Sequence, residues 1–516
     1  NLIMKKIIAS LFAVIALIAS SNISFAQTQQ EKINKEIDNN QFELINEFTT
    51  LLSIPNVAAN PAGLNENANW IMQYMQSKGI QNTSLLTLDK ANVPPVVYGE
   101  VKVPGAKETI IFYAHYDGQP VDSTKWYKGV HPFRPSLYTR SIDQGGVITA
   151  WAEKGTPYDP NARIYARGAS DDKAGVMAII NGYATLKKLG ITPSVNIKFF
   201  FEGEEEAGSP NLEQILNKYQ STLSSDLWII CDGPVHQSSK KQLVMGVRGD
   251  THLELTVFGP KRPLHSGHYG NWVLNPAMEL ARLLASMKND KGEITIKGFY
   301  DDVTPLIAAE KDALSKVPAV EEQLKNELGI KATERTGALN NALQLPSLNI
   351  NGIQSAGVGK YSANVIPTKA IASIDLRLVK GNDWKRQQNK VIDHIKAQGF
   401  FVTDKEPTDE ERKLYEKICM VNASDGYNAQ KTSMDNVYVK RISRAIQTVT
   451  SETPVLLPTL GGSLPLYVFE KTLNASPITV PIANHDNNQH AENENIKLKN
   501  FFDGVKMFAS IMTMSK

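Results

Sequence analysis

Three apolar runs in the first half of the chain are each followed at once by residues that can bind a metal ion. The runs cover 109–114, 195–201 and 227–231, and the segment Ala174 to Leu189 has the pattern of a helix that Gly190 closes. Strands that alternate with helices are typical of an α/β sheet. Functional sites in open α/β sheets form outside the carboxyl ends of the strands. The sequence therefore predicts an α/β fold with its site at these strand ends.

The order of expected strands and helices changes near residue 246. From there the pattern reads strand, helix, strand, strand, helix and strand, which suits a ferredoxin-like α+β sandwich. The expected elements of this region are strands over 251–258, 348–353, 370–378 and 400–403, with helices over 276–288 and 384–398. We expect an α/β domain with a mixed sheet, built from 27–245 and 406–516 and interrupted by a smaller α+β domain over 246–405.

The first 26 residues read as an export signal. Lys5 and Lys6 precede an apolar run over 7–19, and small residues follow as far as Ala26. The run is shorter than the about 20 residues that span a membrane. Translation is expected to start at Met4. The pattern predicts cleavage after Ala26 and a periplasmic or secreted protein that is not held by the membrane.

Composition excludes several classes of protein. The chain is 42% hydrophobic and 21% charged, which argues against a disordered or polytopic membrane protein. The formal net charge of +2, from 55 basic and 53 acidic residues, gives no basic excess for nucleic-acid binding. The two cysteines, Cys231 and Cys419, exclude a disulfide-dense scaffold and a zinc module built from cysteines. Whether these two cysteines are paired stays open at this point.

The strand ends supply the ligand types that zinc prefers, which are histidine nitrogen and carboxylate oxygen. The candidates are His115 and Asp117 after the first run, residues 202–206 after the second, Asp232 after the third, and Asp171 and Asp172 before the helix. Taken singly, a His-x-Asp is more often structural, and an Asp-Asp pair before a helix is usually a cap. Two zinc ions about 3.5–4 Å apart share a bridging carboxylate. The joint placement of these residues therefore favours a metal hydrolase.

Several short blocks resemble one known family. They cover residues 114–120, 167–173, 202–209, 264–267, 364–367, 375–378, 461–465 and 490–494. In this order they resemble the dizinc metallopeptidase family of carnosinases, bacterial dipeptidases, aminoacylases and glutamate carboxypeptidases. The interrupted architecture is also similar to that family's catalytic domain with an inserted lid or dimerisation domain. The resemblance covers the chain from about residue 40 to its end.

The resemblance implies a set of metal ligands. His115, Asp171 and Asp232 would bind one Zn²⁺, while Asp171, Glu206 and His490 would bind the other, with Asp171 bridging the two ions. Mn²⁺ or Co²⁺ could take their place. The peptide bond that joins Asp171 to the next residue is expected to be cis, as in the family.

The resemblance also implies the catalytic residues of this centre. Asp117 would orient the ring of His115. Glu205 would act as general base on a zinc-bound water and then pass the proton to the leaving amine.

Further residues are implied to contact the substrate. His265 would reach the site of a partner subunit in a homodimer formed through the lid domain, and would stabilise the oxyanion there. Arg377 would bind the free C-terminal carboxylate of the substrate, with Asn364 and Ser463 completing the grip. The alternative for Arg377 is a surface ion pair. His268 departs from the family pattern and receives no role.

The leading hypothesis is a secreted dizinc dipeptidase, because the Asp-Gly-Gln-Pro stretch at 117–120 looks closer to the dipeptidase and carnosinase branch. Its substrate would be a small peptide or an N-acyl amino acid, with no nucleic acid involved. An N-acyl-amino-acid amidohydrolase or a carboxypeptidase with the same site is the first alternative. A periplasmic solute-binding protein is the alternative from another class, although it would not need five metal ligands and a free base.

Overall fold

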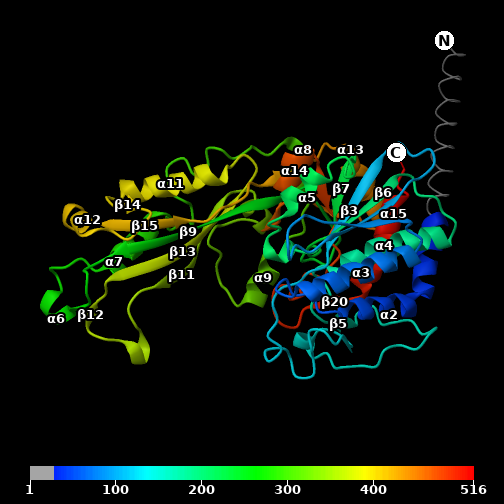
Figure 1. Ribbon diagram of the computed structural model, residues 1–516, viewed down its shortest axis with the longest axis horizontal. Helices are drawn as coiled ribbons and strands as arrows, with labels where there is room; N and C mark the ends of the chain where they lie inside the picture. The colour runs from blue at the N-terminus through cyan, green and yellow to red at the C-terminus, as the bar shows by residue number, and fades with distance from the viewer. Residues whose placement is uncertain (1–27, 516) are drawn as a thin grey trace, which may run out of the picture. The chain divides into compact units, whose positions relative to one another are not determined.

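The computed structural model describes residues 28–515 (Figure 1). The expected export signal, including Met4 and Ala26, lies outside the described residues. Among the helices of the described part, none combines the length and the apolar character that crossing a membrane requires.

The chain divides into two compact units, each described here by itself. The first comprises residues up to Leu243 together with 435–455 and 471–516, and the second comprises 244–434 and 456–470. The chain passes from one unit to the other within β8 (Gln242–Val244), within β17 (Val455–Leu457) and within α14 (Tyr467–Leu473). The first unit is thus formed by separated stretches of the chain, with the stretches of the second unit between them.

The first unit contains an eight-stranded mixed sheet in the order β1-β2-β6-β3-β7-β19-β8-β17. Its strands are β1 (Asn82–Leu86), β2 (Val96–Val101), β3 (Thr109–His115), β6 (Asn196–Glu202), β7 (Leu227–Ile230), β8 (Gln242–Val244), β17 (Val455–Leu457) and β19 (Pro477–Thr479). β6, β3, β7 and β19 run parallel, whereas β1 and β2 are antiparallel neighbours. The three apolar runs of the sequence form the adjacent strands β3, β6 and β7, so their carboxyl ends meet at one edge of the sheet.

Helices bury the apolar side chains of this sheet. They are α2 (Gln41–Leu52), α3 (Pro61–Ser77), α4 (Lys173–Lys188), α5 (Leu212–Lys218), α13 (Val437–Thr450), α14 (Tyr467–Leu473) and α15 (Leu498–Met512). α4 packs on β3 and α15 packs on α4. Gly182 allows this close packing, because a Cβ atom there would lie 3.0 Å from the backbone nitrogen of Ala509. The helix predicted over 174–189 is thus α4, displaced by one residue.

A three-stranded sheet of the first unit has the order β20-β5-β4. Its strands are β4 (Ser136–Tyr138), β5 (Arg163–Tyr165) and β20 (Asn495–Lys497). Through the antiparallel pairing of β5 with β20, two segments far apart in the sequence are held side by side. One of them leads into the loop that carries Asp171, and the other follows the loop that carries His490.

The second unit contains a seven-stranded sheet whose main order is β11-β13-β9-β15-β14, with β16 and β18 also pairing with β9 (Figure 1). The strands are β9 (Gly246–Phe258), β11 (Ser347–Gln354), β13 (Lys369–Leu378), β14 (Phe401–Thr403), β15 (Ile418–Ala423), β16 (Gln430–Lys431) and β18 (Leu460–Ser463). α7 (Pro276–Ser286) packs on β9 and β13, and α11 (Trp384–Ala397) packs on β9 and β15. Their apolar residues form one core with the inner face of the sheet.

Two details of the second unit differ from the prediction. The strand expected to complete the sandwich, over 400–403, is the edge strand β14, and β15 occupies the place beside β9. Since β15 pairs antiparallel with β9, the compact unit continues to Met434 rather than ending at 405. Residues 418–421 are an apolar run, but the pairing partner lies too far away in the sequence to be read from it. The function of this unit as a lid or dimerisation domain stays a prediction.

Smaller elements complete the second unit. β10 (Leu264–His265) pairs with β12 (Val365–Ile366). The short helices are α6 (Ser266–Tyr269), α8 (Ala308–Ser315), α9 (Glu321–Leu328), α10 (Leu339–Ala342) and α12 (Asp409–Leu414).

Candidate metal centre

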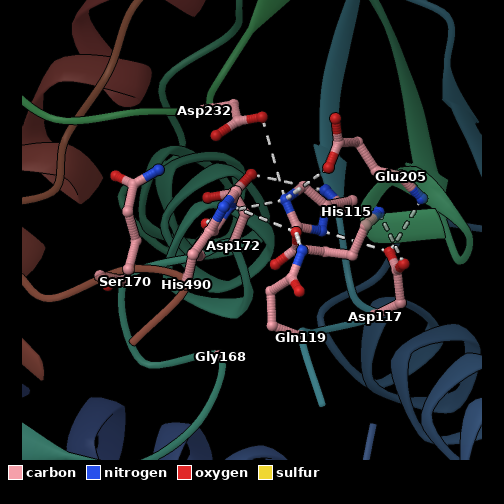
Figure 2. Close-up of polar contacts among 12 residues, drawn as sticks. His115, Asp117, Gln119, Gly168, Ser170, Asp172, Glu205, Asp232 and His490 are labelled. Carbon is pink, nitrogen blue, oxygen red and sulfur yellow. Dashed lines mark hydrogen bonds and ion pairs between the residues drawn. The ribbon is translucent and has the colours of Figure 1, made fainter. Parts of the chain in front are cut away.

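His115 ends β3 and its side chain is fully buried. Its Nε2 atom lies 3.0 Å from Oδ1 of Asp171, and 3.9 Å from carboxylate oxygens of both Glu205 and Asp232 (Figure 2). Its Nδ1 atom lies 3.3 Å from Oδ1 of Asp117. The strand-end residues that the sequence singled out are therefore brought together around one imidazole ring.

The carboxylate of Asp171 lies between two histidines. Its Oδ1 atom faces His115, and its Oδ2 atom lies 3.3 Å from Nε2 of His490. The same Nε2 atom of His490 lies 3.3 Å from Oε2 of Glu206. A carboxylate that presents one oxygen to each of two histidines has the arrangement expected of a bridging ligand.

The described residues contain two groups that can hold a metal ion. One is formed by His115, Glu205 and Asp232, and the other by Asp171, Glu206 and His490, with the ligand atoms of each group within 4.8 Å of one another. The second group consists of the same three residues that were predicted to bind the second metal ion. The first contains Glu205, the predicted base, although Asp171 Oδ1 is nearer to His115 Nε2 than the Glu205 carboxylate is. The predicted role of Glu205 as general base remains a prediction, and its place in this group makes a ligand role an alternative.

The strand register explains why these side chains converge. Because β3 lies between β6 and β7, His115 is opposite Glu202 at the end of β6. The chain then forms a 3₁₀ turn over Glu205–Ala207 and reverses at Gly208, whose φ of 82° is left-handed. This turn places Glu205 and Glu206 beside the end of β3. His490 itself has a φ of 62°.

Asp117 connects the histidine with this turn. Its two carboxylate oxygens accept hydrogen bonds from the backbone N–H groups of Glu205 (3.1 Å) and Glu206 (2.9 Å). Gln119 donates from Nε2 to Oε2 of Glu206 at 2.7 Å. Sequence reasoning had linked Asp117 only to His115. The contact made by Gln119 was missed, although this residue stands in one of the quoted blocks.

Carboxylates are crowded at this edge of the sheet, and burial raises their pKa values. It raises the pKa of Asp232 to about 6 and that of Glu206 to about 8, with nearby Asp171 adding to both. Burial also raises the pKa of Glu205 well above its ordinary value. Several buried carboxylates at one point are costly in free energy unless cations neutralise them.

The two histidines are surrounded by carboxylates, which raise their pKa values. A hydrogen bond with Asp171 raises the pKa of His490 to about 9. Burial would lower the pKa of His115, but Asp117 and Asp171 raise it well above the ordinary value. Burial would raise the pKa of Asp171, but its bonds with both histidines hold it below the ordinary range. Apart from its 3.3 Å contact with Nε2 of His490, the buried Oδ2 atom of Asp171 has no hydrogen-bond partner in the described structure. This set of nitrogen and oxygen donors fits divalent zinc.

The peptide bond between Asp171 and Asp172 is cis, as predicted. Asp172 precedes α4, but its side chain makes no capping hydrogen bond to that helix. Its Oδ2 atom instead accepts a hydrogen bond of 3.4 Å from the backbone N–H of His115. The capping alternative is therefore not the contact that the Asp172 side chain makes.

The other predicted site residues belong to the second unit. Arg377, on β13, donates from Nε to Asp375 at 2.9 Å and from Nη1 to Oγ of Ser463 at 2.9 Å. Its side chain is about one-third exposed and is 3.6 Å from Asp250, so an ion pair is present as well as the contact with Ser463.

Asn364 and His265 lie in neighbouring segments of this unit. The backbone carbonyl of Asn364 accepts a hydrogen bond from the N–H of Ser266 at 3.0 Å. Nδ1 of His265 accepts one from the N–H of Gly267 at 3.1 Å, and the ring of His268 lies 4.6 Å from the His265 ring. The functional roles of His265, Asn364, Arg377 and Ser463 stay predictions.

Cys231 and Cys419 are both free and buried, which answers the question of their pairing. Burial raises the pKa of the Cys231 thiol well above its ordinary value. Cys231 is therefore a packed residue at the end of a strand rather than a nucleophile.

Comparison with known proteins identifies related chains. The family model for peptidase family M20/M25/M40 matches residues 111–514. The Cys-Gly metallodipeptidase of Schizosaccharomyces pombe is 26% identical over 495 residues, covering 93% of this chain and 97% of that protein. Human Beta-Ala-His dipeptidase is 27% identical over 424 residues, covering 81% of this chain and 77% of that protein.

Solved structures agree with these relatives. An M20 family metallo-carboxypeptidase from Sulfolobus solfataricus has a TM-score of 0.74 and 28% identity, covering 92% of this chain and 99% of that one. Human carnosine dipeptidase 1 has a TM-score of 0.72 and 25% identity, covering 94% and 98%. These matches confirm the predicted family, the fold class and a metal-dependent peptidase. Together with the two ligand groups, they confirm a two-metal cofactor.

One prediction is corrected by the comparisons. The prediction of a periplasmic or secreted enzyme is contradicted, because the yeast Cys-Gly metallodipeptidases that match this chain are enzymes of the cytosolic type. The basis for export was two lysines, an apolar run and small residues as far as Ala26, all of which lie outside the described residues. The alternative of a solute-binding protein receives no support from the relatives, which are named as peptidases.

Proposed function

We propose that this chain, which belongs to peptidase family M20/M25/M40, is a dipeptidase that hydrolyses dipeptides or short peptides with a free C-terminal carboxylate. The observation that carries this proposal is the carboxylate of Asp171 lying between His115 and His490, each within a group of metal-binding side chains. The choice of dipeptides is supported by the names of the relatives, which are dipeptidases of fungi and mammals.

Five side chains would hold two metal ions. His115, Asp171 and Asp232 would bind one ion, and Asp171, Glu206 and His490 the other, with zinc the best match to these ligands. When bound, the ions supply Lewis-acid polarisation of the scissile carbonyl. Since the carboxylates balance the charge of two divalent cations, the free-energy cost of crowding them falls when both ions are present.

Glu205 would be the general base. It would take a proton from the attacking water and then give that proton to the leaving amine, so its carboxylate ends each turnover as it began. Its side chain is 12% exposed and lies 3.9 Å from Nε2 of His115, so it stands beside the proposed ions without being one of the five ligands. Because Asp117 binds the backbone N–H of Glu205, it would keep this base beside His115.

The second unit would supply the substrate contacts. The planar guanidinium of Arg377 matches a carboxylate in geometry and charge, and Ser463 already holds one of its nitrogens in place. Asn364 would complete this grip. His265 would stabilise the oxyanion in the site of a partner subunit, which makes a homodimer through this unit part of the proposal.

A carboxypeptidase is the second candidate, favoured by the likeness to the metallo-carboxypeptidase from Sulfolobus solfataricus. An N-acyl-amino-acid amidohydrolase would use the same site. Both substrate types share a C-terminal carboxylate with dipeptides, so the proposed grip by Arg377 does not separate them.

A substrate panel separates these activities. The purified protein, stripped with a chelator and reloaded with Zn²⁺, Mn²⁺ or Co²⁺, would be assayed on dipeptides, longer peptides and N-acetyl amino acids. We expect the metal-free protein to be inactive and the reloaded protein to cleave dipeptides best. Metal analysis of the reloaded protein should give two ions per chain, as the two ligand groups require. Cleavage of the N-acetyl compounds alone would overturn the dipeptidase proposal.

A further inference from the structure

We propose that Glu494 is a positioning residue that fixes Asp171 and His490 relative to each other and thereby sets the affinity of the site they form for its metal ion. The inference rests on the proposed metal centre, but it concerns a residue that is not a member of either ligand group.

The carboxylate of Glu494 is fully buried and accepts hydrogen bonds at both oxygens. Oε1 accepts from the backbone N–H groups of Ser170 (2.8 Å) and Asp171 (3.0 Å), and from the hydroxyl of Ser170 (3.0 Å). Oε2 accepts from Nη1 of Arg167 (2.8 Å) and from the N–H of Gly168 (3.0 Å). An ionised carboxylate has about four lone-pair sites, so these donors use its full capacity.

These contacts hold the loop that carries Asp171. The loop includes three backbone N–H groups that point to one carboxylate, and Gly168 has a left-handed φ of 78°. Buried N–H groups that lose their acceptor cost free energy, so the loop would rearrange if this carboxylate were removed. Because the backbone nitrogen of Asp171 is one of the donors, its carboxylate would move with the loop.

The same residue belongs to the segment that carries His490. The carbonyl of Glu494 accepts a hydrogen bond of 3.2 Å from the N–H of Ala166, next to the pairing of β20 with β5. Arg167, the ion-pair partner of Glu494, also donates to the carbonyl of Ala491 at 3.0 Å. The Glu494–Arg167 pair thus joins the loop of Asp171 to the loop of His490.

The two ligand groups depend on this pair to different degrees. His115 is the last residue of β3 and is paired with Glu202 of β6, and Asp232 follows the end of β7 by two residues. His490 lies in a loop and its side chain is 58% exposed. Besides the contact of its own ring with Asp171, the backbone of its loop is joined to the Asp171 loop through the Glu494–Arg167 pair. Loss of the Glu494 carboxylate should therefore weaken the ion at His490 before the ion at His115.

The test is Glu494→Gln, which keeps the shape of the side chain but replaces one acceptor oxygen by an N–H₂ group and removes the charge. Metal content would be measured by elemental analysis after equilibration with buffered free Zn²⁺, and Co²⁺ loading would be followed by visible absorption. We expect the ion at His490 to bind about 10- to 100-fold more weakly, as with other residues that support metal ligands. The ion at His115 should be weakened less, because Asp171 is the only one of its ligands that lies in this loop. The Co²⁺ spectrum should change accordingly.

The matched control is Asp486→Asn. Asp486 lies in the same segment and pairs with Arg163 on β5 at 2.7 Å, but it makes no contact with the Asp171 loop in the described structure. This variant should keep both ions at the affinity of the unaltered protein. Equal weakening in both variants would mean that any damage to this segment has the same effect, which would overturn the proposal.

A second variant covers the case in which Glu494→Gln does not fold. Glu494→Asp keeps the charge but shortens the reach, and should weaken the same ion to a smaller extent. Circular dichroism and thermal unfolding of the metal-free variants establish that they are folded. If folded variants bind both ions as the unaltered protein does, Glu494 is merely structural. Metal content is measured without substrate. The effect of the Glu494 variants on metal binding can therefore be interpreted even if the protein has no dipeptidase activity.

Discussion

The Nδ1 atom of His115 lies 3.3 Å from Oδ1 of Asp117, and both side chains are fully buried. Asp117 also accepts the backbone N–H groups of Glu205 and Glu206. One carboxylate therefore lies beside a histidine at one strand end and accepts hydrogen bonds from the turn that follows the next strand, as the proposed orienting role of Asp117 requires. The contact with the turn could not be read from a His-x-Asp pattern, because it depends on the pairing of β3 with β6.

Asp117→Asn should weaken metal binding, because an amide presents N–H hydrogens where His115 and the turn require an acceptor. We expect metal affinity to fall by about 10- to 100-fold, the usual effect of losing a partner of a metal ligand. Zinc titration against a chelating indicator measures the change. Asp122→Asn is the control, since the side chain of Asp122 is 49% exposed and interacts with Thr124 and Lys125. Equal effects in the two variants would contradict the role of Asp117.

Glu205→Gln should separate the base role from the ligand role. If Glu205 is the base, the variant keeps both ions, and kcat falls by about 10²- to 10⁴-fold because no group accepts the proton. Elemental analysis and steady-state kinetics on the same preparation decide between the roles. Loss of one ion would show that Glu205 is a ligand, as its presence in the first group allows. Glu204→Gln is the control, because the Glu204 carboxylate bonds to Asn211 and its loss should leave turnover intact.

Metal binding should strengthen as the pH rises from 6 to 9. Glu206, with a pKa of about 8, and His490, with a pKa of about 9, must both lose a proton before they bind a cation. Each proton displaced makes the affinity depend on pH. Zinc titrations at several pH values measure this slope, and a constant affinity over the range would contradict the proposed ligands.

The metal-free protein should lose stability over the same range. The folded-state pKa of Glu206 (about 8) lies above its ordinary value of 4.5, so the folded state binds more protons than the unfolded state between these values. His490, raised from 6.5 to about 9, acts in the same direction, and its contribution is lost as the pH rises through 9. Thermal unfolding should therefore give a lower midpoint at pH 9 than at pH 6, and added Zn²⁺ should reduce the difference.

Arg377→Ala should impair recognition of the substrate carboxylate. A hydrogen-bonded ion pair contributes about 1.5–3 kcal/mol, which corresponds to about 10- to 100-fold in kcat/KM, mainly through KM. Arg377→Lys should recover only part of this loss, because lysine lacks the planar fork. Arg386→Ala serves as control, since Arg386 is exposed and lies 3.4 Å from Asp302. Unchanged KM values for dipeptides would assign Arg377 to its ion pair with Asp375.

The strand-end residues were predictable because the signal is local. An apolar run followed at once by His115 or Asp232 shows both the strand and the side chain that ends it. The strand β15 was assigned to the wrong unit, because its partner β9 lies more than a hundred residues earlier and no local pattern reveals that pairing. The same reason explains why Gln119 was not linked to Glu206.

The sequence by itself determined the supply of ligands, their order along the chain, and the edge of the sheet at which most of them end. These follow from residue types and from periodicity within short segments. Only the tertiary structure decided which side chains meet. Ser170 and Glu494 are 324 residues apart in the sequence, and their hydrogen bond exists because β5 pairs with β20. Long-range strand pairing and side-chain packing fixed Asp171 between two histidines, since the position of one carboxylate depends on every segment packed around it.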